Sequence, residues 1–93
     1  MRRMAVRWHI FFFGRVQGVG FRYTCQQTAL KHEVSGWVRN LPDRSVEMMV
    51  EGETNVIRAY VEDVCESTHG RVDDKQITKS DASGEFEEME IRR

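Results

Sequence analysis

The spacing of hydrophobic residues switches between a two-residue and a helical repeat along this chain, and that order constrains the fold most. Alternating residues between Val6 and Phe13 predict a first strand whose core face carries Val6, Trp8, Ile10 and Phe12. A helix from Phe21 to about His32 and a second one from Thr54 to about Ser67 follow from the helical repeat. The other predicted strands are Val34–Leu41, Val46–Val50, Val72–Lys79 and a short one at Phe86–Ile91.

The predicted order is therefore strand, helix, strand, strand, helix, strand, followed by one short extra strand. This order is typical of the split βαβ arrangement, so we expect an α+β, ferredoxin-like sandwich in a single domain over residues 1–93. Its sheet should be antiparallel or mixed, with both helices on one face. On the first helix, Phe21, Cys25, Thr28 and Ala29 should face the core, with Leu30 flanking them.

Composition narrows the possible partners. The formal net charge is −1, which does not match the excess of Lys and Arg usual on a nucleic-acid-binding surface. No hydrophobic stretch approaches the roughly 20 residues that span a bilayer, so we expect a cytoplasmic protein that binds neither nucleic acid nor membrane. The two cysteines, Cys25 and Cys65, are expected to be buried free thiols, although the fold would also allow a disulfide between the helices.

The most informative segment runs from Gly14 to Arg22, between the first strand and the first helix. Backbone N–H groups of such a loop and of the first helical turn lack intrahelical partners, and together with the helix dipole they favour an anion. Gly14, Gly18 and Gly20 allow the unusual dihedral angles that point successive N–H groups inward. Arg22 would be unfavourable beside the positive helix end unless a dianion were bound there, and Arg15 adds charge at the loop mouth. A plain connection with an exposed arginine is the alternative.

A second segment, Gly36-Trp37-Val38-Arg39-Asn40, places an asparagine at the end of the second strand. Asparagine at that point is most often a turn former. It gains significance only if the fold brings it beside the glycine loop, and the split βαβ order allows this.

Both segments resemble the signatures of the acylphosphatase family, the first almost residue for residue. The resemblance implies a metal-free, cofactor-free hydrolase that cleaves acyl phosphates to carboxylate and inorganic phosphate. It further implies that Asn40 positions the attacking water and that the guanidinium of Arg22 binds the phosphoryl group. The backbone amides implied to share that binding belong to Arg15, Val16, Gln17, Gly18, Val19 and Gly20. The expected partners are a small acyl phosphate and inorganic phosphate, which is product and inhibitor, and the expected state is a monomer.

Arg44 departs from the family pattern, which usually has glycine in this turn, so either Arg44 takes a positive φ or the turn changes type. Two other functions remain open at this stage. One is an RNA-binding module that uses the aromatic residues Phe11 and Phe13 of the first strand. The other is an acylphosphatase-like domain that only binds phosphate, or one that once served a larger carbamoyl-transferring enzyme. The scattered His9, His32 and His69 are expected to be solvated or capping residues, and the physiological substrate stays open.

Overall fold

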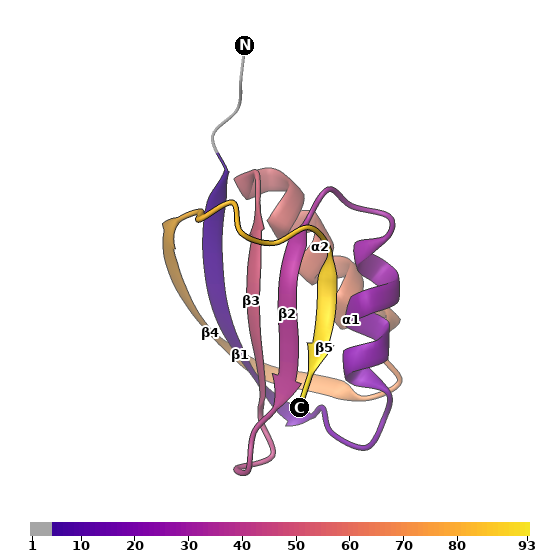
Figure 1. Cartoon of the computed structure of the whole chain (residues 1–93). Coiled ribbons are helices and arrows are strands. Elements are labelled where there is room, and N and C mark those ends of the chain that lie inside the picture. Colours follow the sequence, from indigo (N-terminus) through magenta and orange to yellow (C-terminus); the bar gives the residue numbers. More distant parts are fainter. Residues whose placement is uncertain (1–4) are drawn as a thin grey trace.

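The computed structural model describes residues 5–93, which form one five-stranded sheet and two helices (Figure 1). The elements are β1 (Val6–Arg15), α1 (Phe21–Ala29), β2 (Ser35–Asn40), β3 (Val46–Gly52), α2 (Thr54–Ser67), β4 (Arg71–Asp81) and β5 (Met89–Arg92). This order confirms the expected α+β, ferredoxin-like sandwich with an additional short strand.

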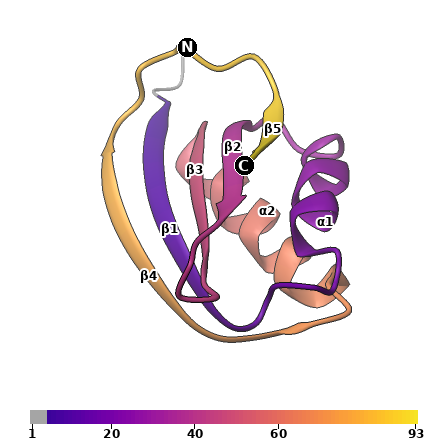
Figure 2. The ribbon, with the colours of Figure 1, turned by 60° about the horizontal axis from the view of Figure 1, so that its bottom comes forward.

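The strands lie in the order β4-β1-β3-β2-β5, and the sheet is mixed. β1 runs antiparallel to β3 and β4, and β2 runs antiparallel to β3, whereas β5 is parallel to β2. Because β4 and β5 are opposite edges of the sheet, residues 82–88 must cross it from one edge to the other. Figures 1 and 2 show this crossover passing over the face of the sheet that the helices leave uncovered.

Both helices pack on one face of the sheet, and the core lies between them and that face. Trp8, Ile10 and Phe12 on β1 are buried there, as the alternation predicted. The four expected residues of α1 are also buried, and α2 contributes Ile57, Tyr60, Val61 and Val64. The Tyr60 hydroxyl donates a 2.7 Å hydrogen bond to the Cys25 carbonyl, which ties the two helices together.

Two boundaries differ most from the prediction, the end of α1 and the start of β5. α1 ends at Ala29 because the following amides of residues 30–32 bond three residues back, which tightens the chain into turns. Leu30 is consequently 77% exposed, so its expected place beside the core was wrong. β5 begins at Met89 rather than Phe86, and Met89 is the buried residue of that strand.

Cys25 and Cys65 are both free. Cys25 is buried among the core residues, and burial strongly raises the pKa of its thiol. Cys65 is only half-buried, so the expectation of a fully buried thiol holds for Cys25 alone. Between residues 5 and 93, neither helix is long and apolar enough to cross a membrane.

Candidate active site

The loop of residues 16–20 connects the end of β1 to the start of α1. Gly18 and Gly20 have φ angles of 76° and 74°, in the left-handed region that glycine adopts without strain. Gly14, just before the loop, lies where the pairing of β1 with β4 shifts register, and a Cβ there would come within 2.5 Å of the Arg71 carbonyl oxygen. The backbone conformation at Gly18 and Gly20 and the close contact at Gly14 therefore explain why glycine stands at these three positions.

Three side chains hold the loop in place. Val16 is buried in the core, and Val19 packs partly against it. The Gln17 side-chain NH₂ donates hydrogen bonds to the carbonyl oxygens of Leu41 at 2.8 Å and Ser45 at 2.7 Å, in the turn between β2 and β3. The loop and that turn are thus fixed relative to each other.

The backbone N–H groups of residues 16–20 donate no hydrogen bond to any other residue within the described part of the chain. The first helical bond runs from the Thr24 amide to the Gly20 carbonyl. A short stretch of unpaired amides at the positive end of α1 is a favourable environment for an anion.

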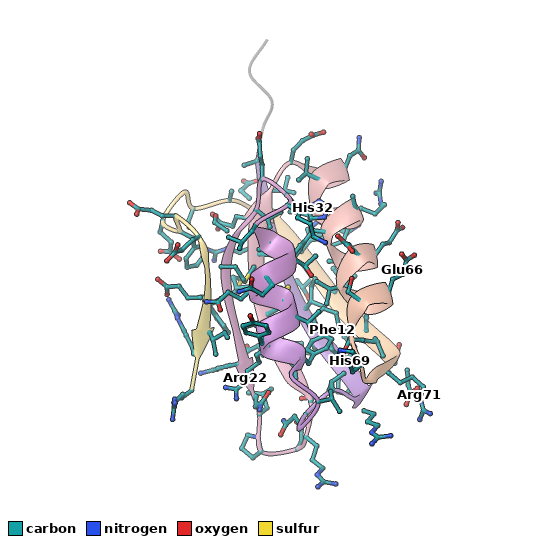
Figure 3. The ribbon with its side chains drawn as sticks, turned by 90° about the vertical axis from the view of Figure 1, so that its right-hand side faces the viewer. Phe12, Arg22, His32, Glu66, His69 and Arg71 are labelled. Carbon is teal, nitrogen blue, oxygen red and sulfur yellow. The ribbon has the colours of Figure 1, made fainter. Side chains whose placement is uncertain are left out.

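A cavity of about 220 Å³ lies between this loop, the start of α1 and the ends of β2 and β5. Its walls are formed by Val16, Gly18, Gly20, Phe21, Arg22, Tyr23, Asn40 and Ile91. Figure 3 shows Arg22 at the foot of α1, beside the loop. The Arg22 guanidinium donates one long hydrogen bond, 3.3 Å, to the Arg92 carbonyl, so most of its donors remain available.

Asn40 is the last residue of β2 and pairs with Val46 across the hairpin. Its side-chain oxygen is buried and has no hydrogen-bond partner among the described residues. An unpaired buried oxygen costs about 1–3 kcal/mol, and such groups call for an explanation. A half-turn of the amide group exchanges its oxygen and NH₂, so Asn40 can present either an acceptor or a donor to the cavity.

The cavity walls carry one charge, that of Arg22, and hold no histidine or carboxylate from the described residues. His9 lies on the opposite face of the sheet and bonds Glu47 at 2.7 Å. His32 bonds Asp63 at 3.0 Å, at the far end of α1 from Arg22 (Figure 3). Nor do residues 5–93 contain a group of three or more His, Cys, Asp or Glu side chains placed to hold a metal ion.

The structure thus brings together most, but not all, of the residues expected at the site. Arg22, Asn40, Val16, Gly18 and Gly20 share the cavity. The other members of the expected set lie around it: Arg15 and Gln17 line a neighbouring cavity, and Val19 packs against the core.

Sequence reasoning missed two residues of the cavity wall. Tyr23 is 62% exposed in the first turn of α1, and its position directly after Arg22 was the only signal available. Ile91 comes from β5, and nothing in the sequence indicated that this strand would lie parallel to β2 at the mouth of the site.

The chain is similar in sequence to proteins of one known family. The family model described as Acylphosphatase matches residues 8–91. The chain belongs to the acylphosphatase family. It is 41% identical over 90 residues to an acylphosphatase of Geotalea uraniireducens, covering 95% of this chain and 98% of that one. It is also 42% identical over 76 residues to an acylphosphatase of Bacillus subtilis, with 81% and 84% of the two chains covered.

Solved structures show the same relationship. The crystal structure of acylphosphatase from Bacillus subtilis superposes with a TM-score of 0.88 at 36% identity, covering 95% of this chain and 99% of that one. Full-length HypF, in a phosphate- and nucleotide-bound form, contains a region that matches the whole chain with a TM-score of 0.85 at 26% identity, although this covers only 12% of HypF. The family assignment and the ferredoxin-like fold are thereby confirmed. The chain is an enzyme that hydrolyses the carboxyl–phosphate anhydride bond of acyl phosphates.

Proposed function

We propose that this acylphosphatase works by in-line attack of water on a phosphoryl group, with no metal ion. The phosphoryl group would be bound by the Arg22 guanidinium and the backbone amides of residues 15–20, and Asn40 would position the water. The water oxygen bonds to phosphorus while the bond from phosphorus to the acyl oxygen breaks. The products are a carboxylate and inorganic phosphate.

The donor set supports phosphate as the bound group. A guanidinium fork matches two phosphate oxygens, and loop amides with no protein acceptor can serve the remaining oxygens. A dianion also removes the unfavourable interaction between Arg22 and the positive end of α1. Charge stabilisation of this kind is usually the largest contribution to catalysis of phosphoryl transfer.

The observation that carries the proposal is the side-chain oxygen of Asn40. It is buried without a partner, in a residue that lines the same cavity as Arg22 and Gly18. A structural turn former would normally use its oxygen to accept a backbone hydrogen bond. An amide that lacks such a bond beside an anion site is suited to orient a small polar molecule such as water.

The proton that the water gives up would go to an oxygen of the substrate phosphate. The leaving group is a weakly basic carboxylate, so the anhydride is already activated and positioning can supply most of the acceleration. With no histidine or carboxylate on the walls described, the cavity itself offers no strong base. Replacing His9, His32 or His69 by Gln is therefore expected to leave turnover within a few-fold of wild type.

We also propose that residues 1–93 act as a single catalytic unit, as a monomer in the cytoplasm. The proposal for the compartment draws on the two free cysteines, since thiols persist in reducing surroundings. Sedimentation at micromolar concentration tests the monomer, and localisation of the tagged protein in cells tests the compartment.

The proposed roles are tested by hydrolysis of benzoyl phosphate in the presence of a chelator, with wild type, Arg22→Ala and Asn40→Ala. Arg22→Ala should weaken inhibition by inorganic phosphate, whereas Asn40→Ala should lower kcat about 100-fold or more while phosphate inhibition persists. An Asn40→Ala enzyme that turns over normally would refute the role of Asn40. Loss of all wild-type activity with the chelator would refute the metal-free reaction.

A further inference from the structure

A second cavity, of about 470 Å³, borders the loop of residues 16–20. It is lined by Gly14, Arg15, Val16, Gln17, Gly18 and Arg44. The two cavities share Val16 and Gly18, so only one stretch of the loop separates them. The second cavity therefore adjoins the one in which the phosphoryl group is proposed to bind.

Two arginines stand at this second cavity without protein partners. Neither the Arg15 nor the Arg44 guanidinium forms a hydrogen bond or ion pair with any residue between 5 and 93, and both side chains are exposed. The other arginines between residues 7 and 92 all have partners in the described structure: Arg7, Arg22, Arg39, Arg58, Arg71 and Arg92. Two cations that line one hollow and have no partner among the described residues favour an anionic occupant.

Arg44 occupies an unfavourable backbone position. Its φ is 76°, and within the described chain it is the only residue other than glycine with a positive φ. Glycine would fill this position without strain. Retention of a long cationic side chain there is the kind of local strain that clusters at ligand sites.

The position of Arg44 is well defined because its turn is fixed at both ends. Gln17 bonds the carbonyl oxygens of Leu41 and Ser45 on either side of the turn. Ser45 donates from its amide and its hydroxyl to the Asp43 carboxylate, and these bonds hold the pKa of Asp43 below its ordinary value. The Asp43 carboxylate is therefore already bonded to Ser45 within the turn, and Asp43 does not line the cavity.

An acidic group beside Gly14 is also paired. The Asp73 carboxylate lies beside Gly14, but the Arg71 guanidinium bonds it at 2.6 Å. The charge that the second cavity presents is thus that of Arg15 and Arg44.

We propose that Arg15 and Arg44 form a subsite for a second negative charge on the acyl group of the substrate. This inference rests on the proposed function of the first cavity, and it names the substrate class: acyl phosphates whose acyl part carries a further anionic group, carboxylate or phosphate. The chemistry of the reaction is unchanged, because the second charge only determines which substrates bind and react well.

The test compares substrates that differ in one group. The substrates are 4-carboxybenzoyl phosphate, 4-phosphonobenzoyl phosphate and 4-carbamoylbenzoyl phosphate, whose ring substituent is uncharged. The readout is the ratio of kcat/KM for each charged substrate to kcat/KM for the uncharged one. Exposed charge pairs typically change such a ratio by about two- to five-fold each, so Arg44→Gly should lower it by about that factor. The Arg15→Gln/Arg44→Gly double variant should lower it by about ten-fold. The phosphonate arm shows whether a dianion is preferred to a carboxylate.

Two controls separate the subsite from a general effect of charge. Arg58→Gln removes the same charge from an exposed position on α2, and the ratio should then stay at its wild-type value. Arg44→Lys keeps the charge, so its ratio of kcat/KM values should stay close to that of wild type. Raising the salt concentration should lower the wild-type ratio and leave that of the double variant unchanged.

The outcomes distinguish the two proposals. If the uncharged substrate is hydrolysed in an Arg22-dependent manner but the ratio does not respond to Arg44→Gly, the subsite is refuted and the catalytic site stands. If hydrolysis does not depend on Arg22, the proposed function itself fails. An equal fall in the ratio for Arg58→Gln would reduce the effect to net charge and overturn the subsite.

Discussion

Two loops of this molecule carry backbone amides outside the helix and strand ladders, and they differ in whether those amides have an acceptor. In the crossover of residues 82–88, the amides of Ser83 and Gly84 donate to the buried carboxylate of Glu51 at 2.9 and 3.0 Å. Arg7 donates to the same carboxylate at 2.7 Å. In the loop of residues 16–20, the amides have no acceptor among the described residues, and Arg22 stands beside them.

The backbone conformation matches as well. Gly84 has a φ of 75°, close to the 76° of Gly18. Both loops therefore combine a left-handed glycine, backbone amides outside the helix and strand ladders and one nearby arginine, which are features typical of anion binding. The amides of the crossover bind a carboxylate of the protein and so stabilise the structure. Those of residues 16–20 have no acceptor among the described residues, and in the function proposed above they bind the phosphoryl group.

The largest expected difference is between the effects of replacing Arg22, beside the loop of residues 16–20, and Arg7, beside the crossover. Arg22→Ala should lower kcat/KM for benzoyl phosphate about 1,000-fold, because it removes a charged donor to the reacting group. Its stability should change by less than about 0.5 kcal/mol, since its one protein bond is long and it lies at a helix N-terminus. Arg7→Ala should show the opposite pattern, losing about 2 kcal/mol of stability with activity of the folded protein within a few-fold. Urea unfolding and steady-state kinetics on both variants check this, and equal effects of the two substitutions on activity would break the comparison.

The contribution of the Glu51 carboxylate, which the crossover amides bind, to stability should depend on pH. Burial alone would raise the pKa of Glu51, but hydrogen bonds from the amides of Ser83 and Gly84 and from Arg7 hold it below its usual value of 4.5. A carboxyl with a lowered folded-state pKa stabilises the fold above its unfolded pKa, and that stability is lost as pH falls through the folded pKa. Glu51→Gln should thus be about 2 kcal/mol less stable than wild type at pH 7, and the gap should narrow below about pH 4. Urea midpoints across this range measure the gap, and a gap independent of pH would contradict the assignment.

Replacing Gly18 or Gly84 by alanine should have smaller effects, and the two variants form a matched pair. A Cβ at Gly18 or Gly84 would meet no atom within 4 Å, so the cost of either alanine is that of the left-handed backbone, about 1 kcal/mol. Both variants should lose similar stability in urea. Only Gly18→Ala should also lose activity, by about ten-fold, because its new methyl group borders the cavity. Equal activity of the two variants would show that phosphate does not approach the loop backbone at Gly18.

The smallest effect is expected at the turn that faces the loop. Arg44→Gly relieves the strain of a positive φ, so the free energy of unfolding should rise by about 0.5 kcal/mol. Arg44→Ala keeps the strain and serves as the control, with no gain expected. A loss of stability in the glycine variant would mean that the Arg44 side chain makes stabilising contacts of its own.

The sequence predicted the elements that repetition of hydrophobic residues determines. Alternation on β1 identified Trp8, Ile10 and Phe12 as core residues, and helical spacing identified the buried face of α1. Boundaries such as the end of α1 at Ala29 depend on a switch from four-residue to three-residue hydrogen bonds, which leaves no trace in the hydrophobic pattern.

The site was predictable where its residues are adjacent in the chain. Gly18, Gly20 and Arg22 lie in one short segment with recognisable backbone requirements. Ile91 could not be foreseen, because it depends on a strand that pairs in parallel across a crossover. The role of Glu51 was equally hidden, since an acidic residue on the outer face of a strand gives no sign that a distant loop will bind it.

The central claim is that the amides of residues 16–20 bind phosphate while those of Ser83 and Gly84 are already occupied. Titration of the ¹⁵N-labelled protein with inorganic phosphate, followed by amide chemical shifts, tests it directly. We expect saturable shifts at residues 16–20 and at the Asn40 side chain, none at Ser83 and Gly84, and loss of all of them in Arg22→Ala. Saturable shifts elsewhere with residues 16–20 unmoved would contradict the account.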